Sequence, residues 1–264
     1  MVNLLKSIWS YRQFILRSIK NDVINQYIRS KLGAAWALLN PITQVLIYAL
    51  IFSNILAIKL PEIGNKYAYA IYLMAGLLAW NLFSDTISRC LTLFIDNANL
   101  LKKMQFPRIT LPVIVMGTSF VNNMLLFFSI VVIFLLIGHQ FTWHILLIFP
   151  LTVLLFLFAL AIGLFLGVLN VFVRDIGQAV PVILQIGFWF TPIVYPLNIV
   201  PEPYQHLLAL NPVFHFTKAY QAILVYGQLP EFSSIVLVAG LCLISLFFSL
   251  VLFRRAQAEM VDVL

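Results

Sequence analysis

The chain has 264 residues, of which 62% are hydrophobic and only 9% are charged, and its formal net charge is +7. A soluble domain usually carries about 25% charged residues, because polar groups must cover its surface. The composition therefore excludes an ordinary water-soluble fold and indicates an integral membrane protein. We read the positive net charge as a signal of membrane topology and not of nucleic-acid binding.

Several charge-free runs are long enough to cross a membrane, which takes about 20 apolar residues in a helix. The run 109–173 is too long for one span, and Gly138-His139-Gln140 divides it. Helices are expected because backbone groups in the hydrocarbon core must pair within their own segment. The sequence predicts an all-α integral membrane protein with six transmembrane helices, near 33–58, 67–89, 109–137, 145–172, 177–196 and 232–253.

Residues 1–31 precede the first predicted span and are expected to form an amphipathic helix on the inner membrane face. At about 100° per residue, apolar side chains from Leu4 to Val23 fall in one sector, and Lys6, Arg17 and Lys20 fall in another. A basic polar face opposite an apolar face suits the membrane interface. The alternative is a tail whose positive charges only orient the first span.

The basic residues also predict which loops face the cytoplasm, because cytoplasmic loops are rich in Lys and Arg. With the N-terminus inside, the inner segments hold 13 of the 16 basic residues, and the outer segments hold Lys59, Lys66 and Lys218. Both termini are therefore expected to be cytoplasmic. The first 31 residues show no pattern of a cleavable signal peptide.

The segment 190–231 is too polar and too interrupted to form two more spans, although it keeps many apolar residues. Its prolines, which include Pro192, Pro196, Pro201 and Pro212, favour short pieces of helix. We expect short re-entrant or outer helices between spans five and six. Irregular backbone at membrane depth needs burial in protein or a water-lined cavity, so this segment points to a conduit. An ordinary loop on the outer lipid surface is the alternative.

Motifs of catalysis are missing from the sequence, which has no phosphate-binding loop, nucleophile elbow or Cys/His metal cluster. We therefore expect a protein that is not an enzyme and that holds no cofactor or metal itself. Charged residues within spans mark ion-coupled carriers, and only Asp85 and Arg89 qualify here. Their spacing of four predicts an ion pair on one helix face. Cys90 and Cys242 are interpreted as small packing residues.

Four local strings resemble a known family. They are 27–41, which ends in Asn40-Pro41, then 97–108, 170–176, and 191–196 followed by 210–212. In this order and on a six-span topology, they are similar to the permease subunit of type-2 ABC exporters for cell-surface polysaccharide, such as O-antigen, capsule or teichoic acid. The resemblance covers nearly the whole chain.

The resemblance implies one transmembrane permease domain over 1–264, with a cytoplasmic interface helix at 1–31, a six-span region at 32–253 and a cytoplasmic tail at 254–264. It implies an ATP-driven exporter in the bacterial inner membrane for lipid-linked polysaccharide, most simply O-antigen on undecaprenyl diphosphate. The implied partners are a second copy of the chain, two ATP-binding-cassette subunits that carry ATP and Mg²⁺, the substrate and membrane lipids. An ABC permease for a drug or lipid, and a channel or ion-coupled carrier without an ATPase, remain open.

The resemblance also implies roles for individual residues. Coupling to the ATPase is expected of Arg12, Arg17, Asp96, Asn97, Leu100, Lys102, Lys103 and Arg108. Arg29 and Lys31 are expected to hold the lipid diphosphate at the cytoplasmic mouth, since cationic donors suit phosphate, although lipid headgroups are an equally good partner. The channel is expected to be lined by Trp36, Tyr48, Phe188, Trp189, Phe190 and Tyr195. The alternatives are topology-setting charges for the basic residues and interfacial belts for the aromatic rings.

Overall fold

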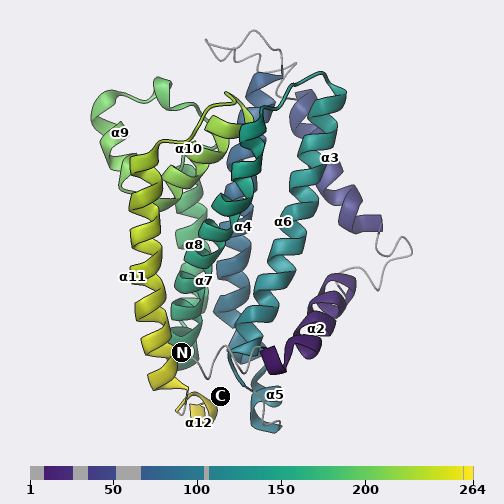
Figure 1. Cartoon of the computed structure of the whole chain (residues 1–264). Helices are drawn as coiled ribbons and strands as arrows, with labels where there is room; N and C mark the ends of the chain where they lie inside the picture. The colour runs from purple at the N-terminus through teal and green to yellow at the C-terminus, as the bar shows by residue number, and fades with distance from the viewer. Residues whose placement is uncertain (1–8, 26–34, 52–66, 104–106, 258, 264) are drawn as a thin grey trace.

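The computed structural model describes residues 9–25, 35–51, 67–103, 107–257 and 259–263 (Figure 1). All regular elements in these residues are helices. Four are long and apolar enough to cross a membrane, namely α4 (Ala68–Asp96), α6 (Thr110–Leu136), η3 (Trp143–Leu147) continued by α7 (Ile148–Phe172), and α11 (Phe232–Ala256). The predicted all-α membrane fold is confirmed.

Two shorter helices, α3 (Trp36–Ile51) and α8 (Ile176–Trp189), stand where the sequence predicts spans one and five. The 16 residues of α3 cover about 24 Å at a rise of about 1.5 Å per residue. The remainder of that predicted span, 52–58, lies outside the described residues. The predicted end of span five at 196 is wrong, because α8 stops at Trp189 ahead of Pro192, whose ring cannot continue the helix.

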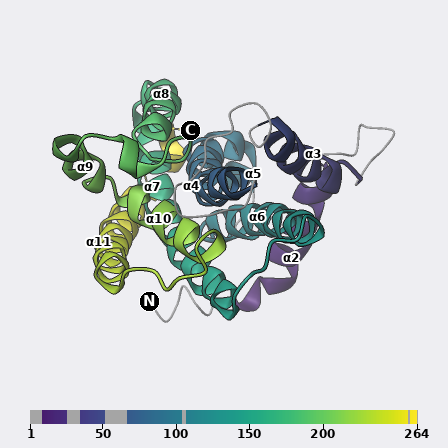
Figure 2. The same ribbon diagram turned by 90° about the horizontal axis from the view of Figure 1, so that it is seen from above.

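The central helix of the bundle is α4, which packs against α6 and α7 (Figure 2). Two glycines of α7 bring its backbone close to Cys90 of α4. A Cβ added at Gly167 would lie 2.2 Å from the Cys90 carbonyl oxygen, and one added at Gly163 would lie 2.8 Å from the Cys90 Cβ. Small residues allow such close helix contacts inside membranes. The α4–α7 pair is therefore tightly packed, and Cys90 is a buried packing residue, as predicted.

Polar side chains connect the other core helices to α4. The Asn123 Nδ2 of α6 donates to the Leu78 carbonyl oxygen at 3.0 Å, and the Asn170 Nδ2 of α7 donates to the Leu91 carbonyl oxygen at 2.9 Å. Hydrogen bonds of this kind stabilise helix contacts in membranes by about 0.6 kcal/mol on average. They fix the rotation of α6 and α7 about their own axes more than they add to the free energy of unfolding.

The chain beyond α8 forms η4 (Leu197–Ile199), α9 (Glu202–Ala209) and α10 (Pro212–Leu224), which confirms the short helices predicted between spans five and six. α10 packs on α4 and buries Phe216 and Tyr220, so this part of the segment is not a loop lying on lipid. The side chain of Asn211 caps α10 by accepting a hydrogen bond from the Val213 N–H at 3.0 Å. The Asn211 Nδ2 also donates to the Thr191 Oγ1 at 2.8 Å, which ties α10 to the end of α8.

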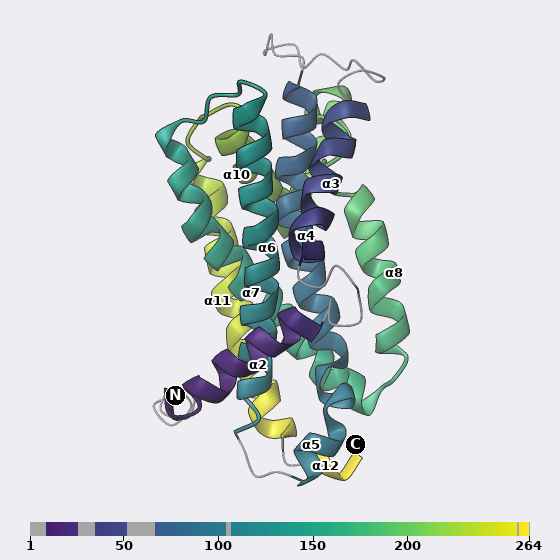
Figure 3. The ribbon, with the colours of Figure 1, turned by 90° about the vertical axis from the view of Figure 1, so that its right-hand side faces the viewer.

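The opposite end of the bundle carries α2 (Arg12–Asn25), α5 (Ala98–Lys103) and α12 (Met260–Val263) (Figure 3). The described part of the predicted amphipathic segment is thus helical, and α2 packs across α6. Ile19 fits there because Gly117 has no side chain, since a Cβ at Gly117 would lie 2.1 Å from the Ile19 Cδ1. Trp9 and Leu16 remain 71% and 65% exposed, as expected for a helix that faces lipid headgroups.

Candidate functional site

One face of α4 is hollowed on either side of a shared strip at Ser84 and Ser88. A cavity of about 490 Å³ opens between α3, α4 and α6, and a second cavity of about 450 Å³ opens between α4 and α8. Both cavities include Ser84 and Ser88 in their walls, so they are two halves of one depression. We call this depression the α4 groove. It is flanked by α3 on one side and by α8 on the other (Figure 2).

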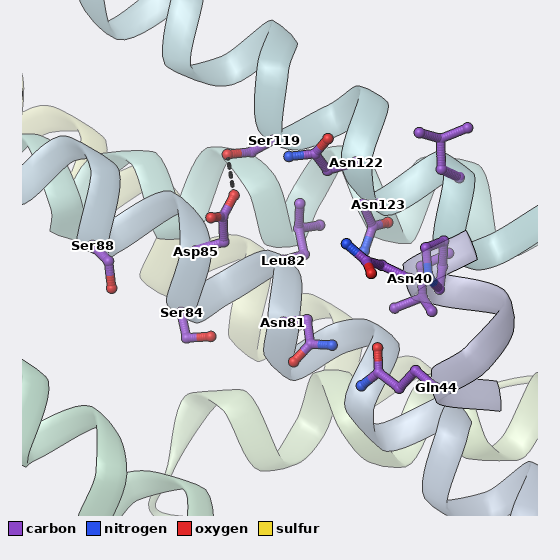
Figure 4. A pocket seen from close by; sticks show the side chains of 13 residues that line it. Asn40, Gln44, Asn81, Leu82, Ser84, Asp85, Ser88, Ser119, Asn122 and Asn123 are labelled. Atoms are coloured by element: carbon purple, nitrogen blue, oxygen red, sulfur yellow. Dashed lines mark hydrogen bonds between the residues drawn. The ribbon is translucent and has the colours of Figure 1, made fainter. Parts of the chain in front are cut away.

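The half of the groove next to α3 is lined mainly by amides and hydroxyls (Figure 4). These polar side chains come from three helices: Asn40, Gln44, Asn81, Ser84, Asp85, Ser88, Ser119, Asn122 and Asn123. Polar side chains within a membrane face a water-filled cavity or the interior of a bundle, since lipid offers them no partner. Their convergence from α3, α4 and α6 therefore indicates a hydrated path.

Asp85 is held at the edge of the polar half by two partners. The Arg89 Nε donates to the Asp85 Oδ1 and Oδ2 at 2.8 and 2.9 Å, which confirms the ion pair predicted from the spacing of four. The Ser119 Oγ donates to the Asp85 Oδ2 at 2.7 Å. α4 continues beyond Arg89 to Asp96, so the helix extends past the predicted end of span two at residue 89. The two side chains are 38% and 32% exposed.

Two amide oxygens of the polar half have no hydrogen-bond partner among the described residues. They are the buried Oδ1 atoms of Asn122 and Asn123. The Nδ2 of Asn123 donates to the Leu78 carbonyl oxygen, which fixes the orientation of that amide and leaves its oxygen as the free end. Leaving a buried acceptor unpaired costs about 1–3 kcal/mol. These oxygens therefore call for a donor from whatever fills the cavity, water or a ligand.

The half of the groove next to α8 contains three aromatic rings, those of Trp80, Phe188 and Trp189. The ring centroids of Trp80 and Phe188 lie 5.7 Å apart at an interplanar angle of 68°, and those of Phe188 and Trp189 lie 5.5 Å apart at 81°. Edge-to-face pairs of this kind stabilise each other and hold their rings in place. Gly187 lets α8 approach Trp80, because a Cβ there would lie 3.2 Å from the Trp80 Cη2.

The structure describes the side chains of five of the six aromatic residues that were expected to line the channel. Phe188 and Trp189 line the groove. Trp36 begins α3 one turn before Asn40, and Phe190 follows α8 with 59% of its surface exposed. Tyr195 turns its hydroxyl to the Trp189 carbonyl oxygen at 2.8 Å and so supports the end of α8. The side chain of Tyr48 lies outside the described residues.

The residues of the groove that the sequence analysis did not single out are Trp80 and most of the polar side chains of the half next to α3. On α4, Asn81, Ser84, Asp85 and Ser88 are spaced by three or four residues and so share one helix face. That spacing was a readable signal within a span. The contributions of Asn40 and Asn122 were not readable, because they depend on how α3 and α6 pack against α4.

The residues predicted to couple to an ATPase lie at the end of the bundle that carries α2 and α5 (Figure 3). The Arg12 Nη1 donates to the Trp9 carbonyl oxygen at 3.0 Å, and its guanidinium lies 5.0 Å from the centroid of the Trp9 ring. Arg17 is exposed on the same helix. The backbone at Arg29 and Lys31 lies outside the described residues.

In the predicted coupling loop, Asp96 ends α4 and the Asn97 Nδ2 donates back to the Leu93 carbonyl oxygen at 2.8 Å. Lys102 is exposed on α5, and Arg108 is half-buried where α6 begins. Leu100 and Lys103 belong to α5, but their side chains lie outside the described residues. The loop therefore presents at least one exposed cation, Lys102, at this end of the molecule.

Comparison with known proteins matches residues 13–225 to the family described as ABC-2 type transporter, and that range includes every helix of the groove. The chain is 29% identical to the O-antigen export system permease protein RfbA of Myxococcus xanthus, over 99% of both chains. It is 28% identical to a Klebsiella pneumoniae protein of the same name, over 84% of both chains. It is 24% identical to the polysialic acid transport protein KpsM of Escherichia coli, over 90% of this chain and 92% of that protein. The chain therefore belongs to the ABC-2 type transporter family.

Proposed function

We propose that the chain is the membrane subunit of an ATP-driven exporter that moves lipid-linked polysaccharide, most simply O-antigen, across the bacterial inner membrane. The observation that carries this proposal is the α4 groove, which places a row of amides and hydroxyls beside a set of aromatic rings. A sugar has hydroxyl edges and apolar ring faces, so both halves of the groove suit it. The names of the full-length relatives support the same substrate class.

In this proposal a second copy of the chain closes the groove. The polar half needs a closed wall, because hydrocarbon cannot solvate its amides. The outer face of α8 offers an apolar rim for that contact, since Val182, Ile183 and Ile186 are 54%, 63% and 52% exposed. Two identical half-channels that face each other give a two-fold arrangement, which is the commonest symmetry of protein pairs.

The energy comes from two ATP-binding-cassette subunits that bind ATP and Mg²⁺. The sequence has no phosphate-binding loop of its own, which supports hydrolysis on a separate subunit. These subunits dock at the end that carries α2 and α5, where the basic residues of the inner loops gather. Both termini are cytoplasmic in this arrangement, in agreement with the distribution of Lys and Arg.

The experiment that tests the proposal is purification of the tagged chain from its native host in a mild detergent, followed by mass spectrometry. We expect a second copy of the chain and a stoichiometric ATPase subunit. A clean homo-oligomer without an ATPase, repeated under gentle conditions, would contradict the proposal and favour a channel or carrier. Clean deletion of the gene tests the substrate class, because polymer should then accumulate on the cytoplasmic side. Unchanged surface polysaccharide would favour a drug or lipid as the substrate.

A further inference from the structure

We propose that the α4 groove selects polysaccharides with uncharged repeat units, and that Asp85, Asn122 and Asn123 determine this selectivity. The inference rests on the proposed function, because it names the charge class of the polymer that the same groove accepts. The name of the Escherichia coli relative gives polysialic acid, an anionic polymer, as what that protein transports, so the charge class of the polymer is a real question for this groove. The chemistry of the groove lining distinguishes between neutral and anionic polymers.

The first argument is charge. Among the described residues that line the polar half, the ionisable side chain is Asp85, and Arg89 already neutralises it through two hydrogen bonds. The aromatic half contributes rings, hydroxyls and the amide of Gln185. The described lining therefore offers no unpaired cation to a carboxylate or phosphodiester. An anionic repeat unit would lose its hydration in the groove without gaining a counter-charge.

The second argument is the sense of the hydrogen bonds. Among the buried lining atoms, those without a partner in the described residues are the Oδ1 atoms of Asn122 and Asn123, which accept hydrogen bonds. The carboxylate of Asp85 also only accepts. A sugar hydroxyl can donate to all of these oxygens, whereas a carboxylate or phosphodiester carries lone pairs alone. At Asp85, Asn122 and Asn123 the groove therefore suits a hydroxyl better than an anion, whereas the amides of Asn40, Gln44 and Asn81 can donate to either.

The third argument is rigidity. An amide could serve an anion by turning its N–H₂ group into the groove. Asn123 cannot do so without breaking the bond from its Nδ2 to the Leu78 carbonyl oxygen. Asp85 is fixed between Arg89 and Ser119. The Asn123 oxygen and the Asp85 carboxylate are therefore held in place before the polymer arrives, and an anion cannot reorganise these two at low cost.

The first test uses the native host. The gene is deleted and restored, and the polysaccharide that disappears and returns at the cell surface is hydrolysed for composition analysis. Hexoses, deoxyhexoses and N-acetylated amino sugars in the main chain support the inference. Uronate, sialate or phosphodiester groups in every repeat unit would overturn it while leaving the proposed function intact. A surface polysaccharide that never changes would contradict the proposed function itself.

The second test uses cells that make two polymers on the same lipid carrier, one neutral and one with a uronic acid in each repeat unit. We expect the native chain to export the neutral polymer at least about tenfold better. The Asn122→Lys variant places a cation in the groove and should reduce that ratio several-fold, whereas Asn122→Gln should keep it. The ratio within one cell is insensitive to how much permease folds. An equal ratio for the native chain, or no change with Asn122→Lys, would refute the assignment.

Discussion

Ser119 of α6 donates a hydrogen bond of 2.7 Å to Asp85 of α4, so the carboxylate in the groove is held from two helices at once. Ser119 is only 2% exposed, and Arg89 is the second partner of the same carboxylate. Without the Ser119 hydroxyl, Asp85 is held by Arg89 of its own helix alone. The position of the groove acceptor therefore depends on a residue that is almost wholly buried.

We expect Ser119→Ala to reduce polysaccharide export by roughly two- to tenfold. A hydrogen bond to a charged group contributes about 1.5–3 kcal/mol when both partners are buried. Asp85 is partly exposed, so water replaces part of the lost bond and the effect should be smaller. Surface polymer per molecule of membrane-inserted permease is the measurement. Ser129→Ala is the matched control on α6, because that hydroxyl donates within its own helix to the Leu125 carbonyl oxygen at 2.7 Å. Equal losses in both variants would show a general effect on α6.

Gly167 offers a test of the packing between α4 and α7. In Gly167→Ala the new Cβ would lie 2.2 Å from the Cys90 carbonyl oxygen, so the two backbones must separate. Overpacking of this kind costs about 1–3 kcal/mol, and we expect a lower midpoint of thermal unfolding in detergent. Gly240→Ala in α11 is the control, since its Cβ would meet nothing within 4 Å. A midpoint for Gly167→Ala equal to that of the control would mean that the helix contact is looser than described.

The cationic loop at α5 offers a test of the docking of the ATPase. Reversing the charges with Lys102→Glu and Lys103→Glu should weaken co-purification of the ATPase subunit, because Lys102 is exposed and cations attract an acidic partner surface. Membrane insertion should be unaffected, which protease protection of the termini can verify. The pair Lys102→Arg and Lys103→Arg keeps the charge and should retain the ATPase. Full retention by the double Glu variant would remove these residues from the coupling surface.

Glu231, just before α11, offers a pH-dependent test at the end of the bundle that carries α9 and α10. Hydrogen bonds from Lys218 and Ser233 and the charge of Lys218 lower the pKa of Glu231 from 4.5 to about 2. A lowered pKa in the folded state stabilises the fold at pH values above 4.5, and this contribution is lost as the pH falls from about 4.5 towards 2.

We therefore expect Glu231 to stay ionised at pH 4 and Lys218→Met to return its pKa towards 4.5. Carboxyl ¹³C NMR of glutamate-labelled protein measures both values. The ion pair is 50–54% exposed, so its contribution to the free energy of unfolding is small. A pKa of Glu231 that Lys218→Met leaves unchanged would exclude Lys218 as the main cause.

The sequence predicts the helices well and the groove only in part. Charge-free runs identify the helices because lipid imposes length and apolarity on each of them independently. The pair Asp85–Arg89 was predictable for the same local reason, since a spacing of four fixes it within one helix. Asn40 and Asn122 meet in the groove only after α3 and α6 have packed, and no local pattern encodes that meeting. Phe190 was chosen for its aromatic ring, but the end of α8 at Trp189 depends on the following prolines.

The hydrogen bond from Asn211 to Thr191 has a mechanical consequence. The Thr191 Oγ1 also donates to the Gly187 carbonyl oxygen in the last turn of α8, so the cap of α10 and the wall of the groove are linked by two short bonds. A tilt of α8 that widens the groove must therefore carry the start of α10 with it. The width of the groove and the position of α10 then vary along a single coordinate.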